Sequence, residues 1–245
     1  MQGLVINIDR YEVYARKELN NWKRRMRRRP SLINKASKGV QDKLNSMLPE
    51  KYHEALTFAI KNMVKLVLAG SQYMTNKTYP NLTLIERERL VRKKLQSYKR
   101  LAMIEGAGTG AGGFLMGLAD FSLLLGIKIK LLYEIAAIYG FNIRDFRERL
   151  YILYIFQLAF SSQERMNEVF VKMENWEEYS KTLPVSMNQF DWRTFQQEYR
   201  DYIDLAKLAQ MLPGVGAVVG FFTNGKLIHK LGETAMNSYR MRILK

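Results

Sequence analysis

The fold is decided by one stretch of the sequence, residues 106–127, which reads GAGTGAGGFLMGLADFSLLLGI. It carries a single formal charge, Asp120, and six of its first twelve residues are glycine. In water each glycine inside a helix costs about 0.8–1 kcal/mol relative to alanine. Such a helix is therefore expected only where the missing side chains let another backbone approach closely, as in GxxxG helix pairs.

A second stretch near the C-terminus has the same character. Residues 208–225 carry no charge, and Gly216 and Gly220 repeat the GxxxG spacing. The strictly apolar part is too short for a simple membrane span. We predict that segments 106–127 and 206–224 pack together as a hairpin-like pair. The pair lies at a membrane surface or partly inserted in it, forms the dry core of a soluble bundle, or spans the membrane. The glycines expected to line this contact are Gly106, Gly108, Gly110, Gly112, Gly113, Gly117, Gly214, Gly216 and Gly220.

The rest of the chain also predicts helices. Thr83-Leu-Ile-Glu86 has the spacing of a capping box, and Gly70 and Gly140 are placed to end helices. Alternation typical of strands is absent. Further helices are predicted over 9–29, 50–69, 150–160 (apolar on all sides) and 226–245. The fold class is therefore all-α: a single helical bundle domain with a central glycine-rich apolar helix pair. We divide the chain into a basic N-terminal helical region, 1–48, and a main domain, 49–245.

Charge and cysteine content limit the partners. The chain has 39 Lys and Arg against 23 Asp and Glu, and residues 1–105 hold 23 and 9 of these. Such an excess suits anionic lipid, nucleic acid or an acidic protein surface. The chain has no cysteine, which excludes disulfides and thiolate metal sites. The N-terminus lacks a secretory signal, so we expect a cytoplasmic protein.

The densest basic run spans residues 22–29. It lacks a recognised nucleic-acid-binding motif, so no specific nucleic acid is expected. Anionic lipid suits it and also accounts for the apolar glycine-rich segments, at about 1 kcal/mol for each basic residue near the surface. The residues predicted to bind an anionic surface are Trp22, Lys23, Arg24, Arg25, Arg27, Arg28 and Arg29.

No motif identifies a reaction. The literal GxGxxG at 108–113 follows a charged helical segment and not a strand, which argues against dinucleotide binding. His53 and His229 have no metal-ligand spacing, so no metal, cofactor or catalytic residue is predicted. Asp120 is the candidate functional acid, because an ionisable residue in an apolar segment needs a partner or a role. A structural role for Asp120, such as capping or pinning a neighbouring helix, is the alternative.

The order of several motifs resembles the EcsC family in its Gram-positive form. The central motifs are Gly106 to Gly113, Gly117-Leu-Ala-Asp120 and Ile135-Ala-Ala-Ile-Tyr-Gly140. Further matching stretches are Trp22-Lys-Arg-Arg-Met26, Ala59-Ile-Lys-Asn-Met-Val64, Leu212-Pro-Gly-Val-Gly-Ala217, Asn224 and Gly232-Glu-Thr-Ala235. The resemblance implies a helical protein linked to an ABC transporter system, and it implies no catalytic residues.

These observations favour a non-enzymatic accessory protein of the EcsC family. It would be lipid-interacting and held peripherally, or partly inserted, at the inner face of the cell membrane. One alternative is a soluble helical bundle that binds an apolar ligand or a partner helix. The other is an enzyme with an unrecognised site around Asp120. The oligomeric state does not follow from the sequence.

Overall fold

The computed structural model describes residues 2–28, 50–70, 75, 77, 79–108, 113–161, 163–186, 189 and 217–244. Within this part no residue lies in a β-strand, which confirms the all-α prediction. The helices are α1 (Gln2–Arg27), α3 (Glu50–Ala69), α4 (Leu84–Gly108), α5 (Gly113–Ile138), α6 (Phe146–Phe160), α7 (Gln163–Glu174), α8 (Trp176–Lys181) and α11 (Ala217–Ile243).

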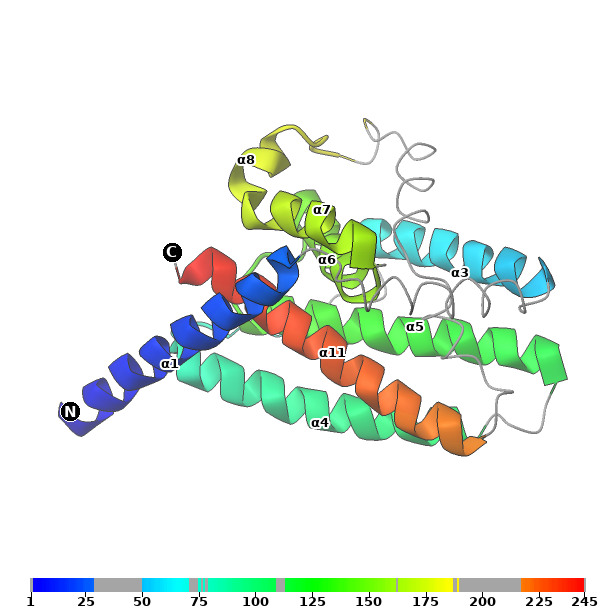
Figure 1. Cartoon of the computed structure of the whole chain (residues 1–245), viewed down its shortest axis with the longest axis horizontal. Coiled ribbons are helices and arrows are strands. Elements are labelled where there is room, and N and C mark those ends of the chain that lie inside the picture. Colours follow the sequence, from blue (N-terminus) through cyan, green and yellow to red (C-terminus); the bar gives the residue numbers. More distant parts are fainter. Residues whose placement is uncertain are drawn as a thin grey trace.

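Three long helices form one side of the molecule (Figure 1). Helix α4 runs antiparallel to both α5 and α11, and it packs most extensively against α11. Helices α3, α6, α7 and α8 lie on the other side, and α1 crosses α4 and α11 with its N-terminus pointing away from the bundle. The division of the chain at residue 48 stays a prediction, although α1 contacts α4, α7 and α11.

The core centres on α6. Every residue from Leu150 to Phe160 is buried, as the apolar run predicted. The predicted helix over 50–69 is confirmed as α3, and it buries one side: Ile60, Met63, Val64 and Val67 are buried, whereas Lys61 and Lys65 are exposed.

Local signals fix the helix ends. The backbone N–H of Thr83 donates to Glu86 Oε2 at 2.9 Å, so the predicted capping box starts α4. Gly70 and Gly140 follow α3 and α5 with φ of 75° and 88°, a left-handed conformation that glycine adopts without strain. Asp145 is the N-cap of α6 and accepts from the Arg147 N–H at 2.8 Å.

The glycine-rich stretch differs from the expected continuous apolar helix. Helix α4 ends at Gly108 and α5 begins at Gly113, so the described glycines of this stretch lie at the end of an antiparallel helix pair (Figure 1). The first residues of α11 lie at the same end of the molecule. The predicted helix over 226–245 is the later part of α11, which already begins at Ala217.

Candidate functional site

The inward face of α4 carries a buried ion pair. Glu88 is fully buried, and Arg240 of α11 donates to it through Nε, 2.6 Å from Oε1, and through Nη2. The Tyr11 hydroxyl of α1 donates to Glu88 Oε2 at 2.6 Å. Burial opposes the charge on Arg240, but the facing carboxylate prevails and raises the pKa of the guanidinium. This cluster therefore joins α1, α4 and α11 and fixes how α4 is rotated.

The α4–α11 contact depends on glycines at two levels. A Cβ on Gly225 would lie 3.1 Å from Met103 Sδ, and one on Gly232 would overlap the methyl groups of Leu95. From Gly225 through Gly232 to Arg240 along α11, the contacted residues of α4 run backwards along the chain, as expected of antiparallel helices. Close helix approach at glycine, the physical principle proposed from the sequence, therefore operates here at two glycines outside the predicted set.

A second buried pair fixes the end of α11. Arg242 Nη1 donates to Glu148 Oε2 of α6 at 2.8 Å. The guanidinium carbon also lies 3.9 Å from the ring centre of Phe141 and 4.6 Å from that of Tyr151. Burial opposes the charge, but the Glu148 carboxylate raises the pKa of Arg242. Both ends of this ion pair are satisfied, so the pair is a structural element.

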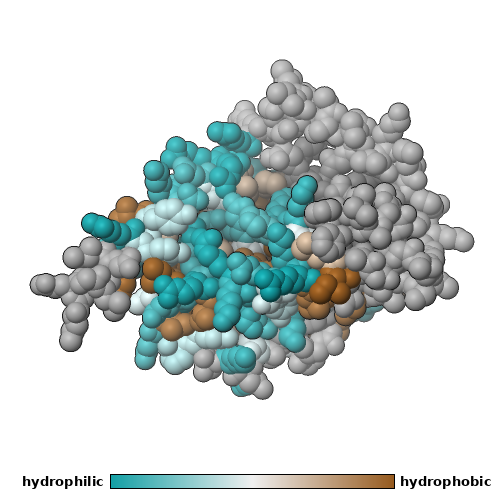
Figure 2. Space-filling view, turned by 90° about the horizontal axis from the view of Figure 1, so that it is seen from below, coloured by the Kyte–Doolittle hydropathy of each residue, from teal (hydrophilic) through white to brown (hydrophobic). Residues whose placement is uncertain are grey.

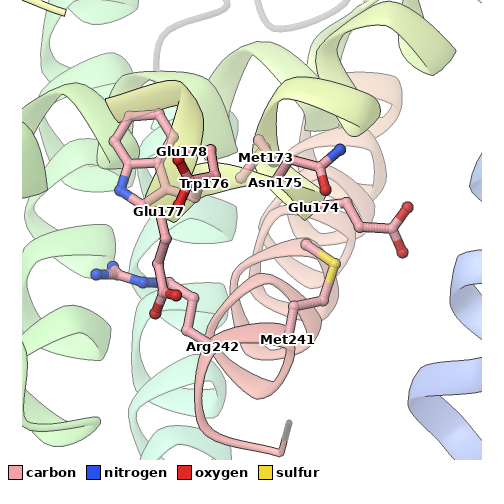
Figure 3. Close-up of a pocket in the computed structure, with 8 residues that line it drawn as sticks. All are labelled: Met173, Glu174, Asn175, Trp176, Glu177, Glu178, Met241 and Arg242. Atoms are coloured by element: carbon pink, nitrogen blue, oxygen red, sulfur yellow. The ribbon is translucent and has the colours of Figure 1, made fainter. Parts of the chain in front are cut away.

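A small cavity of about 170 Å³ lies between the α7–α8 junction and the end of α11 (Figure 3). Met173, Trp176 and Met241 supply its apolar wall, and Glu174 and Arg242 lie at its edge. Ligand sites for drug-sized molecules measure about 300–1,000 Å³. The cavity is smaller than that range, and both of those charged side chains are held in ion pairs, so it defines no ligand.

The outward face of α4 is strongly basic. Since Glu88, Val91 and Ala102 point into the bundle, the helix period turns Arg89, Lys93 and Arg100 to the opposite side. The exposed cations of the helix are Arg89, Arg92, Lys93, Lys99 and Arg100. Arg92 lies 4.0 Å from Glu88, and the other four form no ion pair within the described part of the chain.

Exposed cations on the neighbouring helices extend this basic face. Lys226 of α11 and Lys130 of α5 are both exposed and flank α4 on its two sides. Figure 2 shows the face of the molecule on which α4 lies, and hydrophilic residues dominate its centre. We call the five exposed cations of α4, with Lys130 and Lys226, the α4 basic face.

Part of the basic run at 22–29 makes contacts within the molecule, whereas we predicted that all of it binds an anionic surface. Trp22 is buried and packs edge-on against Phe170, with ring centres 5.6 Å apart. Lys23 and Arg27 lie 3.2 Å and 2.6 Å from Glu174 Oε1. Arg25 lies 2.8 Å from Glu233. Much of this run therefore attaches α1 to α7 and α11.

Other members of the predicted surface set stay open. Arg24 and Arg28 are exposed, and Arg29 lies outside the described residues. The predicted role of Trp22 to Arg29 in binding an anionic surface stays a prediction. The α4 cations were missed, although the spacing of 89, 93 and 100 on one helix face was readable in the sequence.

The predicted packing glycines fall into two groups. Gly106 and Gly108 end α4, Gly113 and Gly117 begin α5, and Gly220 lies near the start of α11. The others lie outside the described residues: Gly110, Gly112, Gly214 and Gly216. Asp120 lies on α5, but its side chain is outside the described part, so its role as a candidate acid stays a prediction.

The described part of the chain holds neither a candidate membrane span nor a candidate metal cluster. None of its helices combines the length and hydropathy that a membrane span requires. No group of three or more His, Cys, Asp or Glu among the described residues is arranged to hold a metal ion.

Lys128 of α5 is buried, and the sequence analysis did not single it out. Its ammonium group donates to the Leu124 carbonyl at 3.5 Å, and burial lowers the pKa of Lys128 to about 7.

These features define an all-α protein in which buried ion pairs fix a helix that presents an exposed cationic face. The chain belongs to the EcsC protein family, which matches residues 14–244. It is 47% identical over 229 residues to Protein EcsC of Bacillus subtilis (strain 168), covering 93% of this chain and 94% of the relative. It is 29% identical over 141 residues to YdbA of the same bacterium, covering 58% and 52%. No solved structure matches this chain.

Proposed function

We propose that this protein is a non-enzymatic accessory protein that attaches peripherally to an anionic membrane surface through the α4 basic face. One observation carries the proposal. Arg89, Lys93, Lys99 and Arg100 are exposed on a helix whose rotation is fixed by the buried Glu88–Arg240 pair. None of the four forms an ion pair within the described residues, and Glu86, one turn before Arg89, is the acid that interacts with this face. Cations held at fixed positions on a rigid helix lose little freedom when they meet a charged surface.

The expected strength is modest. Each basic residue near an anionic bilayer contributes about 1 kcal/mol. The five α4 cations together therefore contribute at most about 5 kcal/mol, which corresponds to a dissociation constant no smaller than about 0.2 mM. Binding of that strength is reversible, and it weakens when salt screens the charges. The proposal therefore describes a protein that exchanges between the membrane surface and solution.

Lipid is favoured over nucleic acid by the position of the cations. They lie on the exposed face of a helix, and no recognised nucleic-acid motif accompanies them within the described residues. A phosphate-rich polymer remains a competitor in the test. Double-stranded DNA should displace the protein from vesicles only when the concentration of DNA phosphates reaches that of the anionic lipid headgroups.

Cell fractionation tests the attachment. Membranes from cells expressing the chain are pelleted in low salt and then washed in high salt. We expect the protein in the low-salt pellet and in the high-salt wash, because the attachment is electrostatic. A protein found wholly in the low-salt supernatant would contradict the proposal. A protein retained after high-salt and alkaline washes would show that electrostatics is not what holds it.

The family resemblance also implies an ABC transporter as a partner. A protein held at the membrane surface by α4 turns α3 and α7 away from the bilayer, toward any part of a transporter that projects from the membrane. We propose this association as secondary to lipid attachment. Co-purification from detergent extracts, with the α4 face either intact or charge-reversed, would detect it independently of the lipid.

A further inference from the structure

The end of α4 that leads toward α5 exposes aliphatic side chains. Ile104 is 67% exposed and Leu101 is 42% exposed. On α5, Leu123 is 49% exposed. The apolar surface of such residues in water is unfavourable unless a partner covers it.

These three residues gather at one end of the α4–α5 pair. The Tyr98 hydroxyl bonds to Glu134 at 2.9 Å, and Lys94 pairs with the same carboxylate at 2.8 Å. Continuing this antiparallel register puts Leu123 level with the last turns of α4. We call Leu101, Ile104 and Leu123 the apolar end. Figure 2 shows hydrophobic surface where the hydrophilic face of α4 gives way toward this end of the molecule.

The charges around the apolar end identify its partner. Arg100 immediately precedes it on α4, and Lys130 lies two turns from Leu123 on the same side of α5; both are exposed. Protein interfaces are depleted of lysine, whereas interfacial membrane segments combine apolar side chains with a belt of Lys and Arg. Lysine and arginine stems can also lie along the acyl region while their charges reach the headgroups.

We propose that the apolar end inserts shallowly into the acyl-chain boundary of an anionic bilayer while Arg100 and Lys130 contact the headgroups. This inference rests on the proposed function and names the element that enters the membrane. It supplies the affinity that the cations alone lack. Burying one aliphatic side chain strengthens partitioning by roughly tenfold or more.

A site-specific probe tests the insertion. The chain has no native cysteine, so Ile104→Cys, Leu123→Cys and Val171→Cys each carry one environment-sensitive fluorophore. Val171 is 47% exposed on α7 and is the matched control for an apolar position away from the α4 face. The labelled proteins are mixed with vesicles of phosphatidylglycerol and phosphatidylcholine, with and without a quencher on the acyl chains. Vesicle binding is measured by flotation on the same samples.

The outcomes separate insertion from surface attachment. We expect bound protein whose probes at 104 and 123 shift to the blue and are quenched, and whose probe at 171 is unchanged. Bound protein with unquenched probes at 104 and 123 would overturn insertion and leave the proposed function standing. Absence of binding would overturn both. A blue shift that follows protein concentration without vesicles would assign the apolar end to a second copy and overturn the proposal.

A pair of unlabelled variants gives a second readout. Ile104→Ser with Leu101→Ser should weaken vesicle binding by about tenfold or more, and Val171→Ser should leave it unchanged. An unchanged affinity for the double variant, with its helical signal intact, would also overturn insertion.

Discussion

Glu88 and Arg240 lie 152 positions apart in the chain and form a bidentate ion pair, with Arg240 Nε 2.6 Å from Glu88 Oε1. Glu88 is fully buried and Arg240 is 3% exposed. Because Tyr11 also donates to Glu88, three helices meet at a single carboxylate. The pair sets which side of α4 faces solvent, and it thereby determines where the basic face lies.

Breaking this pair should destabilise the protein strongly. Glu88→Gln leaves the Arg240 charge buried without a carboxylate, and such losses amount to about 3–5 kcal/mol. We expect a urea midpoint lowered accordingly. The double variant Glu88→Met with Arg240→Met should lose less than the sum of the single replacements, because no buried charge is left behind. Single variants as stable as the parent would show that the pair does not form.

Gly232→Ala tests the close approach of α11 to α4. Alanine adds about 0.8–1 kcal/mol of helix propensity, but its methyl group would overlap Leu95, and overpacking costs about 1–3 kcal/mol. We expect a net loss of stability in thermal or urea unfolding. Adding Leu95→Ala should remove the overlap, so the second change should be less harmful in the Gly232→Ala background than in the parent. Gly225→Ala is the matched control, since the flexible Met103 can yield.

The pairing of α1 with α7 predicts a pH dependence. Burial raises the pKa of Glu174, but hydrogen bonds from Arg27 and Lys23 outweigh it, so the net pKa lies below its usual value. A folded-state pKa below the unfolded one contributes stability above the unfolded pKa, near 4.3, which is lost as pH falls through the folded value. The free energy of unfolding should therefore decline in acid. Glu174→Gln should be less stable at neutral pH and show a shallower decline; an unchanged slope would contradict the role of this pair.

The sequence predicted local features well because their signals are local. The capping box at Thr83, the helix end at Gly140 and the buried run of α6 each depend on residues within a few positions. It did not predict that Lys23 and Arg27 are held by Glu174, because Arg27 and Glu174 lie 147 positions apart. The dense run of cations therefore predicted a surface open to a partner, whereas several of these cations form ion pairs within the molecule.

For the glycines too, the sequence predicted the kind of contact but not the residues that make it. Composition predicted that close helix approach would matter, and Gly225 and Gly232 confirm that it occurs between α4 and α11. It did not predict which glycines make the contact, since this depends on the relative register of two helices far apart in the chain. Nor did it predict that the glycine-rich stretch would separate α4 from α5.

The central claim is that α4 supplies the charges that meet the membrane, and flotation with charge-reversed variants tests it most directly. One variant carries Arg89→Glu, Lys93→Glu and Arg100→Glu on α4. The other carries Lys17→Glu and Arg24→Glu on α1 and Arg28→Glu directly after it, three exposed cations, so the net charge changes equally. We predict that the first variant fails to float with anionic vesicles in low salt, while the second floats like the parent. Loss of flotation in the second variant and retention in the first would contradict the account and place the contact on α1.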